Sequence, residues 1–197
     1  MPVTRSQAVR HTRIPLAGGT QETLLSEVGP VLLRFVSTRD ACALRLVCRE
    51  FLAAVSEHPW EDRGTVIKGS IGAWRACYPH ARCANMQKLG SGSRAAPVVD
   101  ADFVHFEGLR ELYMEGCTDA TDAAFAHLRG IHTLVMEHCS QATITGSSFS
   151  CLKGISVLGM ARCGDAAIAV AQSLGLPVLT QVGTWGPCAF TYEPAEY

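Results

Sequence analysis

Residues 108–117 read GLRELYMEGC, and two later stretches repeat their pattern. Residues 130–139 read GIHTLVMEHC and residues 154–163 read GISVLGMARC. The leading glycine, the final cysteine and, between them, the leucine and methionine that begin as Leu112 and Met114 all return at steps of 22 and then 24 residues. So many matching positions indicate an internal repeat.

A period in the low twenties with leucines at these spacings is typical of leucine-rich repeats, in which each turn adds one short strand. No single turn buries its own apolar residues, so stability belongs to the stacked array and its caps. Residues 100–108 also parallel residues 122–130, which predicts a short helical segment before each strand. We therefore predict a short leucine-rich-repeat solenoid with a parallel strand ladder over 98–187, ending in a degenerate strand near 176–179.

The cysteines of the repeat, Cys117, Cys139 and Cys163, fall where the chain leaves each strand. Stacked strands would bring such thiols to about 4.8 Å from one another, a geometry that a metal or redox site could use. At this position, however, they face the core, and buried structural cysteines are inert. We interpret the three cysteines as packing residues.

A second possible metal site has the spacing C-x-x-H-x-x-C at Cys77, His80 and Cys83. It would supply half of a zinc site, but a structural zinc needs four protein ligands and no fourth is evident. We expect no metal and no cofactor. The chain also lacks a phosphate-binding glycine loop, a nucleophile elbow and an HExxH helix, so we expect no enzyme activity.

Amino-acid composition limits which classes of protein remain possible. The 197 residues are 48% hydrophobic and 18% charged, which suits one domain or two small ones. A net charge of −1 argues against a broad surface for nucleic acid or anionic membranes. No apolar run approaches the roughly 20 residues of a membrane span, and the N-terminus lacks a signal peptide. With nine cysteines, these features predict an intracellular protein with reduced thiols, in the cytoplasm, the nucleus or both.

Two short amphipathic helices are expected before the repeats. The first runs from about residue 22 into the thirties, and the second follows residues 37–40, with apolar side chains three and four apart at Leu44, Val47, Cys48 and Phe51. Trp60 is available to close a small helical core.

Residues 24–51 followed by Pro59 and Trp60 resemble an F-box, and the match from 24 to 51 needs no gap. The segment LVCREF at 46–51 carries the strongest part of the resemblance, whereas Leu25 and Thr38 stand where the family often has proline. The resemblance implies a helical module that docks on a Skp1-like adaptor, and through it on a cullin, in a ubiquitin ligase. The positions that match the family's core or its adaptor groove are Leu24, Leu25, Val28, Leu32, Leu44, Val47 and Cys48.

In that interpretation the repeats bind the protein substrate. If the repeated leucines and methionines point inward, the residues between them form columns on the concave face. The resulting candidates for substrate binding are Glu111, Tyr113, Glu115, Thr133, Val135, Glu137, His138, Val157 and Arg162. Tyr113 is the single large aromatic in these columns, so we expect it to be an exposed anchor.

The sequence thus divides into a disordered basic arm (1–20), an F-box-like module (21–60), an irregular connector (61–97), repeats (98–187) and a tail (188–197). The F-box resemblance implies a substrate-recognition adaptor of an SCF-type ubiquitin ligase. The alternative is an interaction or scaffold protein whose N-terminal helices only cap the solenoid, since exposed repeat ends need covering.

Overall fold

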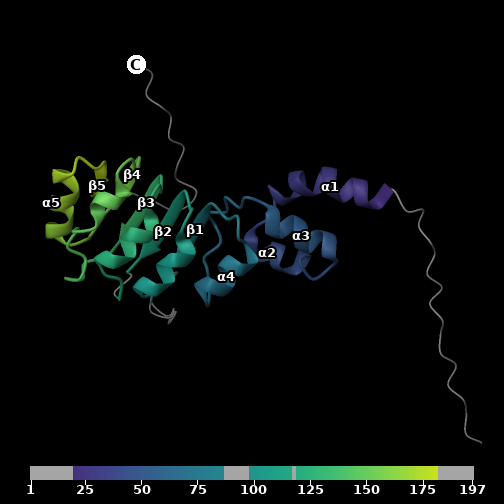
Figure 1. Cartoon of the computed structure of the whole chain (residues 1–197), viewed down its shortest axis with the longest axis horizontal. Coiled ribbons are helices and arrows are strands. Elements are labelled where there is room, and N and C mark those ends of the chain that lie inside the picture. Colours follow the sequence, from purple (N-terminus) through teal and green to yellow (C-terminus); the bar gives the residue numbers. More distant parts are fainter. Residues whose placement is uncertain (1–19, 87–97, 117–118, 182–197) are drawn as a thin grey trace, which may run out of the picture.

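The computed structural model describes residues 20–86, 98–116 and 119–181, with side chains from residue 27 onward. It has a mixed α and β fold built on a five-stranded parallel sheet (Figure 1). The strands lie side by side in chain order: β1 (Cys83–Met86), β2 (Glu111–Glu115), β3 (Thr133–Glu137), β4 (Val157–Gly159) and β5 (Val178–Leu179). The expected mixed class and parallel strands are confirmed, while the arm before residue 20 and the tail 188–197 lie outside the described residues.

The sequence repeat sets the register of the sheet. Leu112 pairs with Leu134 and Leu134 pairs with Leu158, so equivalent residues stand in one column across three strands. Each of these strands follows a glycine with positive φ, namely 78° at Gly108, 78° at Gly130 and 90° at Gly154. Glycine adopts this backbone conformation without a steric penalty, which explains its return in every repeat.

Short helical segments connect the strands: η1 (Asp100–Phe106), η2 (Asp122–Leu128) and η3 (Phe149–Leu152) are 3₁₀ helices, and α5 (Asp165–Ser173) is an α-helix. Their apolar side chains and those of the strands form one core. Phe125 and Phe149 meet edge to face there, with ring centroids 4.9 Å apart. This core includes four phenylalanines and the repeated leucines and methionines of the strands: Phe103, Phe106, Phe125, Phe149, Leu112, Leu134, Leu158, Met114, Met136 and Met160.

Aspartates join one connection to the next. The Asp100 carboxylate accepts hydrogen bonds from the backbone amide and hydroxyl of Thr121, at 2.7 and 2.6 Å. Asp122 repeats this arrangement one turn later with the amide and hydroxyl of Thr145. These bonds satisfy amides that have no partner in the sheet, and they tie each turn to its neighbour.

The N-terminal helices lie beyond the β1 edge of the sheet (Figure 1). They are α1 (Thr20–Leu33), α2 (Thr38–Leu44), α3 (Arg49–Glu57) and α4 (Ile71–Cys77). Trp60 is buried among Leu33, Val55 and Tyr78, and its indole N–H donates to the Val55 carbonyl at 2.8 Å. The predicted role of Trp60 in a small helical core is confirmed. Within the described ranges, no helix combines the length and the apolarity that crossing a membrane requires.

Two expectations about this half were wrong. The segment 61–97 is not irregular throughout, because it contains α4 and the first strand of the sheet, in which Ala84 pairs with Leu112. The apolar spacing around Leu44 to Phe51 does not form one helix, because the backbone at Cys48 is extended (φ −159°, ψ 170°) and separates α2 from α3. The first strand is not predicted from the sequence because it has Ala84 at the repeat's leucine position and shares only Met86, the partner of Met114, with the repeated strands.

Candidate functional site

Large apolar side chains are exposed along the N-terminal helices. Phe35, in the turn after α1, is 85% exposed, and α1 itself buries Leu33 while leaving its neighbours in solvent. Leu46 and Val47 are exposed because the break between α2 and α3 carries them out of the helical core. We call this set the apolar helix surface: Val28, Val31, Leu32, Phe35, Leu46, Val47 and Leu52. Exposed apolar side chains mark a protein-binding surface where they form a contiguous patch.

The residues predicted to bind an adaptor divide between surface and core. Val28, Leu32 and Val47 belong to the apolar helix surface. Leu44 is half-buried against the helical core, and Cys48 is half-buried at the start of α3. The side chains of Leu24 and Leu25 lie outside the described residues. The structure therefore separates exposed residues from half-buried ones, a division that the sequence does not make.

The predicted substrate face is less open than expected. Leu112 and Met114 enter the main core as predicted, whereas Tyr113 joins a separate cluster with Val135 and Cys83. Tyr113 is 2% exposed, so the prediction of an exposed anchor at this residue is wrong, and Val135, also predicted on the open face, is 1% exposed. Alternation assigns a side chain to one face of a sheet, but it does not determine whether other residues cover that face.

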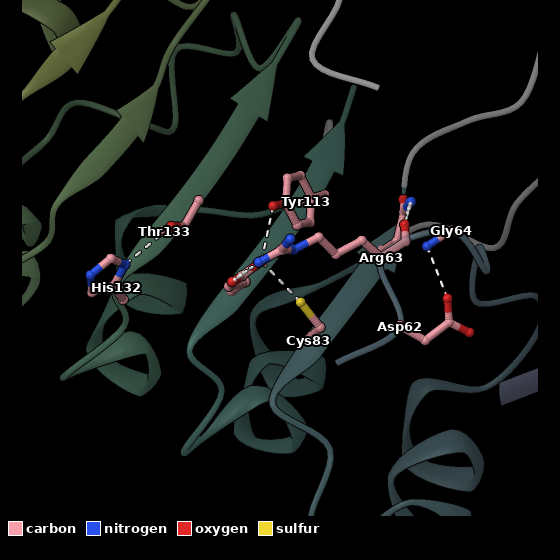
Figure 2. Close-up of polar contacts among 9 residues, drawn as sticks. Asp62, Arg63, Gly64, Cys83, Tyr113, His132 and Thr133 are labelled. Carbon is pink, nitrogen blue, oxygen red and sulfur yellow. Dashed lines mark hydrogen bonds and ion pairs between the residues drawn. The ribbon is translucent and has the colours of Figure 1, made fainter. Parts of the chain in front are cut away.

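Glu111, another predicted face residue, is the acceptor at the centre of a polar cluster. Its donors Arg63, Cys83 and Tyr113 are labelled in Figure 2. The Glu111 carboxylate accepts two hydrogen bonds from the Arg63 guanidinium, both at 2.6 Å. Tyr113 donates its hydroxyl to the same carboxylate at 3.0 Å, and the Cys83 thiol donates at 3.1 Å. The carbonyl of Arg63 in turn accepts from the side chain of Asn85 at 2.7 Å. The cluster thus connects the segment before α4 to strands β1 and β2.

The electrostatics of this cluster follow from its geometry. Burial alone would raise the pKa of Glu111, but the hydrogen bonds from Arg63 and Cys83 lower it to about 2. Burial, together with the hydrogen bond to Glu111, raises the pKa of Cys83 well above its usual value. Burial and the nearby Glu111 carboxylate likewise raise the pKa of Tyr113. At neutral pH the cluster therefore holds one ion pair with a neutral phenol and a neutral thiol, which suits a structural connection.

Four other predicted residues come together at the carboxyl ends of the strands: Glu115, Glu137, His138 and Arg162, which we call the acidic edge. Glu115 and Glu137 are register partners in β2 and β3. His138 and Arg162 have left-handed backbones, with φ of 56° and 57°, and Arg162 donates to the His138 ring at 3.4 Å. The equivalent residue of the first repeat is a glycine, Gly116, with φ of 59°.

Glu137 lies in an unfavourable electrostatic environment within the acidic edge. Burial raises its pKa, the neighbouring Glu115 raises it further, and His138 and Arg162 oppose that shift. One of its carboxylate oxygens, Oε1, is buried without a hydrogen-bond partner in the described part of the chain. A buried acceptor without a donor costs free energy. The acidic edge therefore favours a ligand that brings a positively charged donor.

Two predicted face residues take no part in either cluster. Thr133 is buried and Val157 is half-buried beside it in the register of β3 and β4. The Thr133 hydroxyl lies 3.4 Å from the ring of His132, a weak contact (Figure 2).

The cysteines are placed as follows. Cys139 and Cys163 are buried, and the Cys163 thiol donates to the Met136 carbonyl at 2.9 Å, while Cys117 lies outside the described residues. Burial raises the pKa of Cys163 to about 12, which keeps it a thiol. The Cys83 thiol donates a hydrogen bond to the Glu111 carboxylate. Among the described residues, no three or more cysteine, histidine, aspartate or glutamate side chains are grouped as metal ligands.

Arg63 and Asn85 complete the Glu111 cluster, and the sequence does not predict a functional role for either residue. Arg63 lies 48 residues before Glu111, in a segment without periodicity, so no local pattern indicates this pair. Comparison with protein-family models, curated proteins and solved structures finds no match to this chain.

Proposed function

We propose that this protein is the substrate-recognition adaptor of an SCF-type ubiquitin ligase. Its F-box-like helices dock on a Skp1-like adaptor, and its leucine-rich-repeat region presents the protein substrate. The supporting observation is the apolar helix surface, on which Phe35 and Val47 remain in solvent within the stretch that resembles an F-box. Burying an exposed Leu, Val or Phe side chain contributes about 1.5–3 kcal/mol, so several of them support a stable complex.

The repeat half supports the second part of the proposal. Its strands pair in parallel with the leucines of successive repeats in register, as a leucine-rich-repeat ladder requires. The acidic edge supplies an unpaired buried acceptor and two stacked carboxylates. We therefore propose that the substrate contributes a basic segment.

The docking test is co-purification of the full chain with a Skp1-like protein. The double variant Leu32→Asp/Val47→Asp should abolish the complex, because it places charges in the apolar helix surface. A matched control is Val104→Asp/Leu174→Asp, which alters exposed side chains in the other half; Leu174 is 47% exposed and Leu32 is 51% exposed. Both chains should keep the melting temperature of the parent protein.

The competing function is an interaction protein whose helices only cap the array. The pairing of β1 with β2 favours it, because the N-terminal region already covers that edge of the sheet. If the chain carrying Leu32→Asp/Val47→Asp stays folded and still binds the Skp1-like protein, or if the parent chain does not bind it, the adaptor function is wrong.

The acidic edge is tested with a lysine-rich peptide and a glutamate-rich peptide of equal length. We expect the lysine-rich peptide to bind more tightly, and Glu115→Lys/Glu137→Lys to weaken its binding, because the variant replaces both carboxylates with like charges. Fluorescence anisotropy at two salt concentrations measures both effects, and Glu107→Lys, on the outer connection, provides the control. Equal binding of the two peptides would contradict a basic substrate.

A further inference from the structure

A cavity of about 490 Å³ lies between α2, the segment 64–70 and α4. It shares no residue with the apolar helix surface, the Glu111 cluster or the acidic edge. Sites for small organic ligands in proteins have volumes of about 300–1,000 Å³, and most are apolar with a few placed polar groups. The cavity therefore has the size of a small-molecule site.

The floor of the cavity is apolar and aromatic. Val66 and Ile67 contribute aliphatic surface, and the rings of Trp74 and Tyr78 lie 6.2 Å apart at an interplanar angle of 49°. Tyr78 is buried, and its hydroxyl donates to the Thr38 carbonyl at 2.6 Å. The Cys42 thiol, 2.9 Å away, then donates to the phenol oxygen, because the Tyr78 proton is already committed. These bonds fix the ring before any ligand arrives.

The charged side chains that line the cavity are both cations, while Asp62, outside the lining, accepts hydrogen bonds from the lining residues Thr38, Gly64 and Thr65. Arg39 and Lys68 are the charged side chains among its lining residues, and no acidic side chain lines it. Both are exposed, and in the described part of the chain neither forms an ion pair. Their positive potential therefore remains available to a bound anion.

We propose that this cavity binds a small organic anion with a flat, apolar body. The body packs on Val66, Ile67 and Trp74, behind which Tyr78 is buried, and the acidic group meets Arg39 and Lys68. Thr38, Arg39 and Cys42 come from α2, whereas Trp74 and Tyr78 come from α4 and its end. A ligand here would contact both the N-terminal helices and the segment that leads into the sheet.

The test uses the full chain and three probes with one ring system: 1-naphthoate, 1-naphthylmethanol and 1-naphthylmethylammonium. They differ in charge at one position, so differences in affinity report the charges of the site. We expect saturable binding of naphthoate, at least about tenfold tighter than that of the alcohol, with the ammonium weakest, because hydrogen bonds to a charged group are worth a factor of this size. Calorimetric titration at low salt measures all three.

Three variants locate the binding. Arg39→Gln/Lys68→Gln should remove the advantage of naphthoate and leave the alcohol within about twofold, since only the acidic group loses its partners. Ala73→Trp adds a ring to a lining position and should weaken both probes. The matched control, Arg129→Gln/Lys153→Gln, neutralises exposed cations elsewhere and should change neither.

Thermal melts check that each variant is folded. The proposal is wrong if naphthoate does not bind saturably, or if it binds no tighter than the alcohol. It is also wrong if folded Ala73→Trp retains full affinity, or if the control pair weakens naphthoate as much as Arg39→Gln/Lys68→Gln does. The charge variants remain informative if Ala73→Trp fails to fold, because both of their side chains are exposed.

Discussion

The N-terminal helices and the sheet half differ in how completely they bury their aromatic side chains. Around the sheet, Phe103, Phe125 and Phe149 are fully buried, because each repeat covers its neighbour. Around α1 to α3, a comparable aromatic residue, Phe35, remains in solvent. A repeated turn finds its packing partner in the next turn of the same chain, whereas a few short helices have too little chain to cover all their apolar surface. The sheet half thus buries its aromatic side chains, whereas the helical half leaves Phe35 exposed.

The largest test of this comparison removes one phenyl ring from each half. Phe125→Ala should lower the free energy of unfolding by about 3–5 kcal/mol, because it leaves a cavity beside Phe149. Phe35→Ala should change it by less than about 0.5 kcal/mol, as exposed substitutions do. Urea unfolding at neutral pH measures both. Comparable losses in the two variants would mean that Phe35 is packed and that the two halves do not differ in this way.

The next test concerns the Glu111 cluster, which joins the two halves. Because the pKa of Glu111 is lowered to about 2 in the folded protein, the ionised carboxylate stabilises the fold above its unfolded pKa of about 4.3. This contribution is lost as the pH falls from about 4.5 towards 2. Unfolding free energies over that range should therefore fall more steeply for the parent chain than for Glu111→Gln.

A matched variant controls for the general effect of acid. Glu61→Gln alters an exposed carboxylate paired with Arg82 at 3.3 Å, and it should keep the steep pH dependence of the parent chain. Parallel pH profiles for the parent chain and Glu111→Gln would exclude Glu111 as a source of acid sensitivity.

The smallest expected effect lies within the sheet half, in the aspartate contacts between turns. The Asp122 carboxylate accepts from the amides of Thr145 and Gly146 and from the hydroxyl of Ser147. Asp122→Asn should cost about 1–2 kcal/mol, because one acceptor oxygen and the charge are lost. Asp165→Asn, at the exposed start of α5, should cost less than about 0.5 kcal/mol by thermal melt. If the two variants are equally stable, these contacts do not hold the turns together.

Some features of this protein are present in its sequence. The steps between Leu112, Leu134 and Leu158 predict three parallel strands in one register, and the structure has them. This works because the information is local: alternation along a strand and the return of glycine at each turn follow from the backbone alone. Trp60 is predictable for a similar reason, since a large apolar residue next to two amphipathic helices has one nearby core to enter.

Other features depend on partners that are far apart in the chain. Strand β1 pairs with the edge of β2, although only one of its four residues, Met86, matches the repeat, and Ala84 stands at the leucine position. Tyr113 and Val135 lie on the predicted face, yet both are buried. Position along a strand selects a face, and the surrounding chain decides whether water reaches it.

The candidate sites divide in the same way. The sequence alone brings Glu115, Glu137, His138 and Arg162 to one edge, because the repeat aligns them. Tertiary structure alone pairs Arg63 with Glu111 and brings Arg39 and Lys68 to the lining of one cavity. Charged residues are common at many positions, and only the folded chain determines which of them lose water and meet a partner, because desolvation and Coulomb energy depend on distances in space.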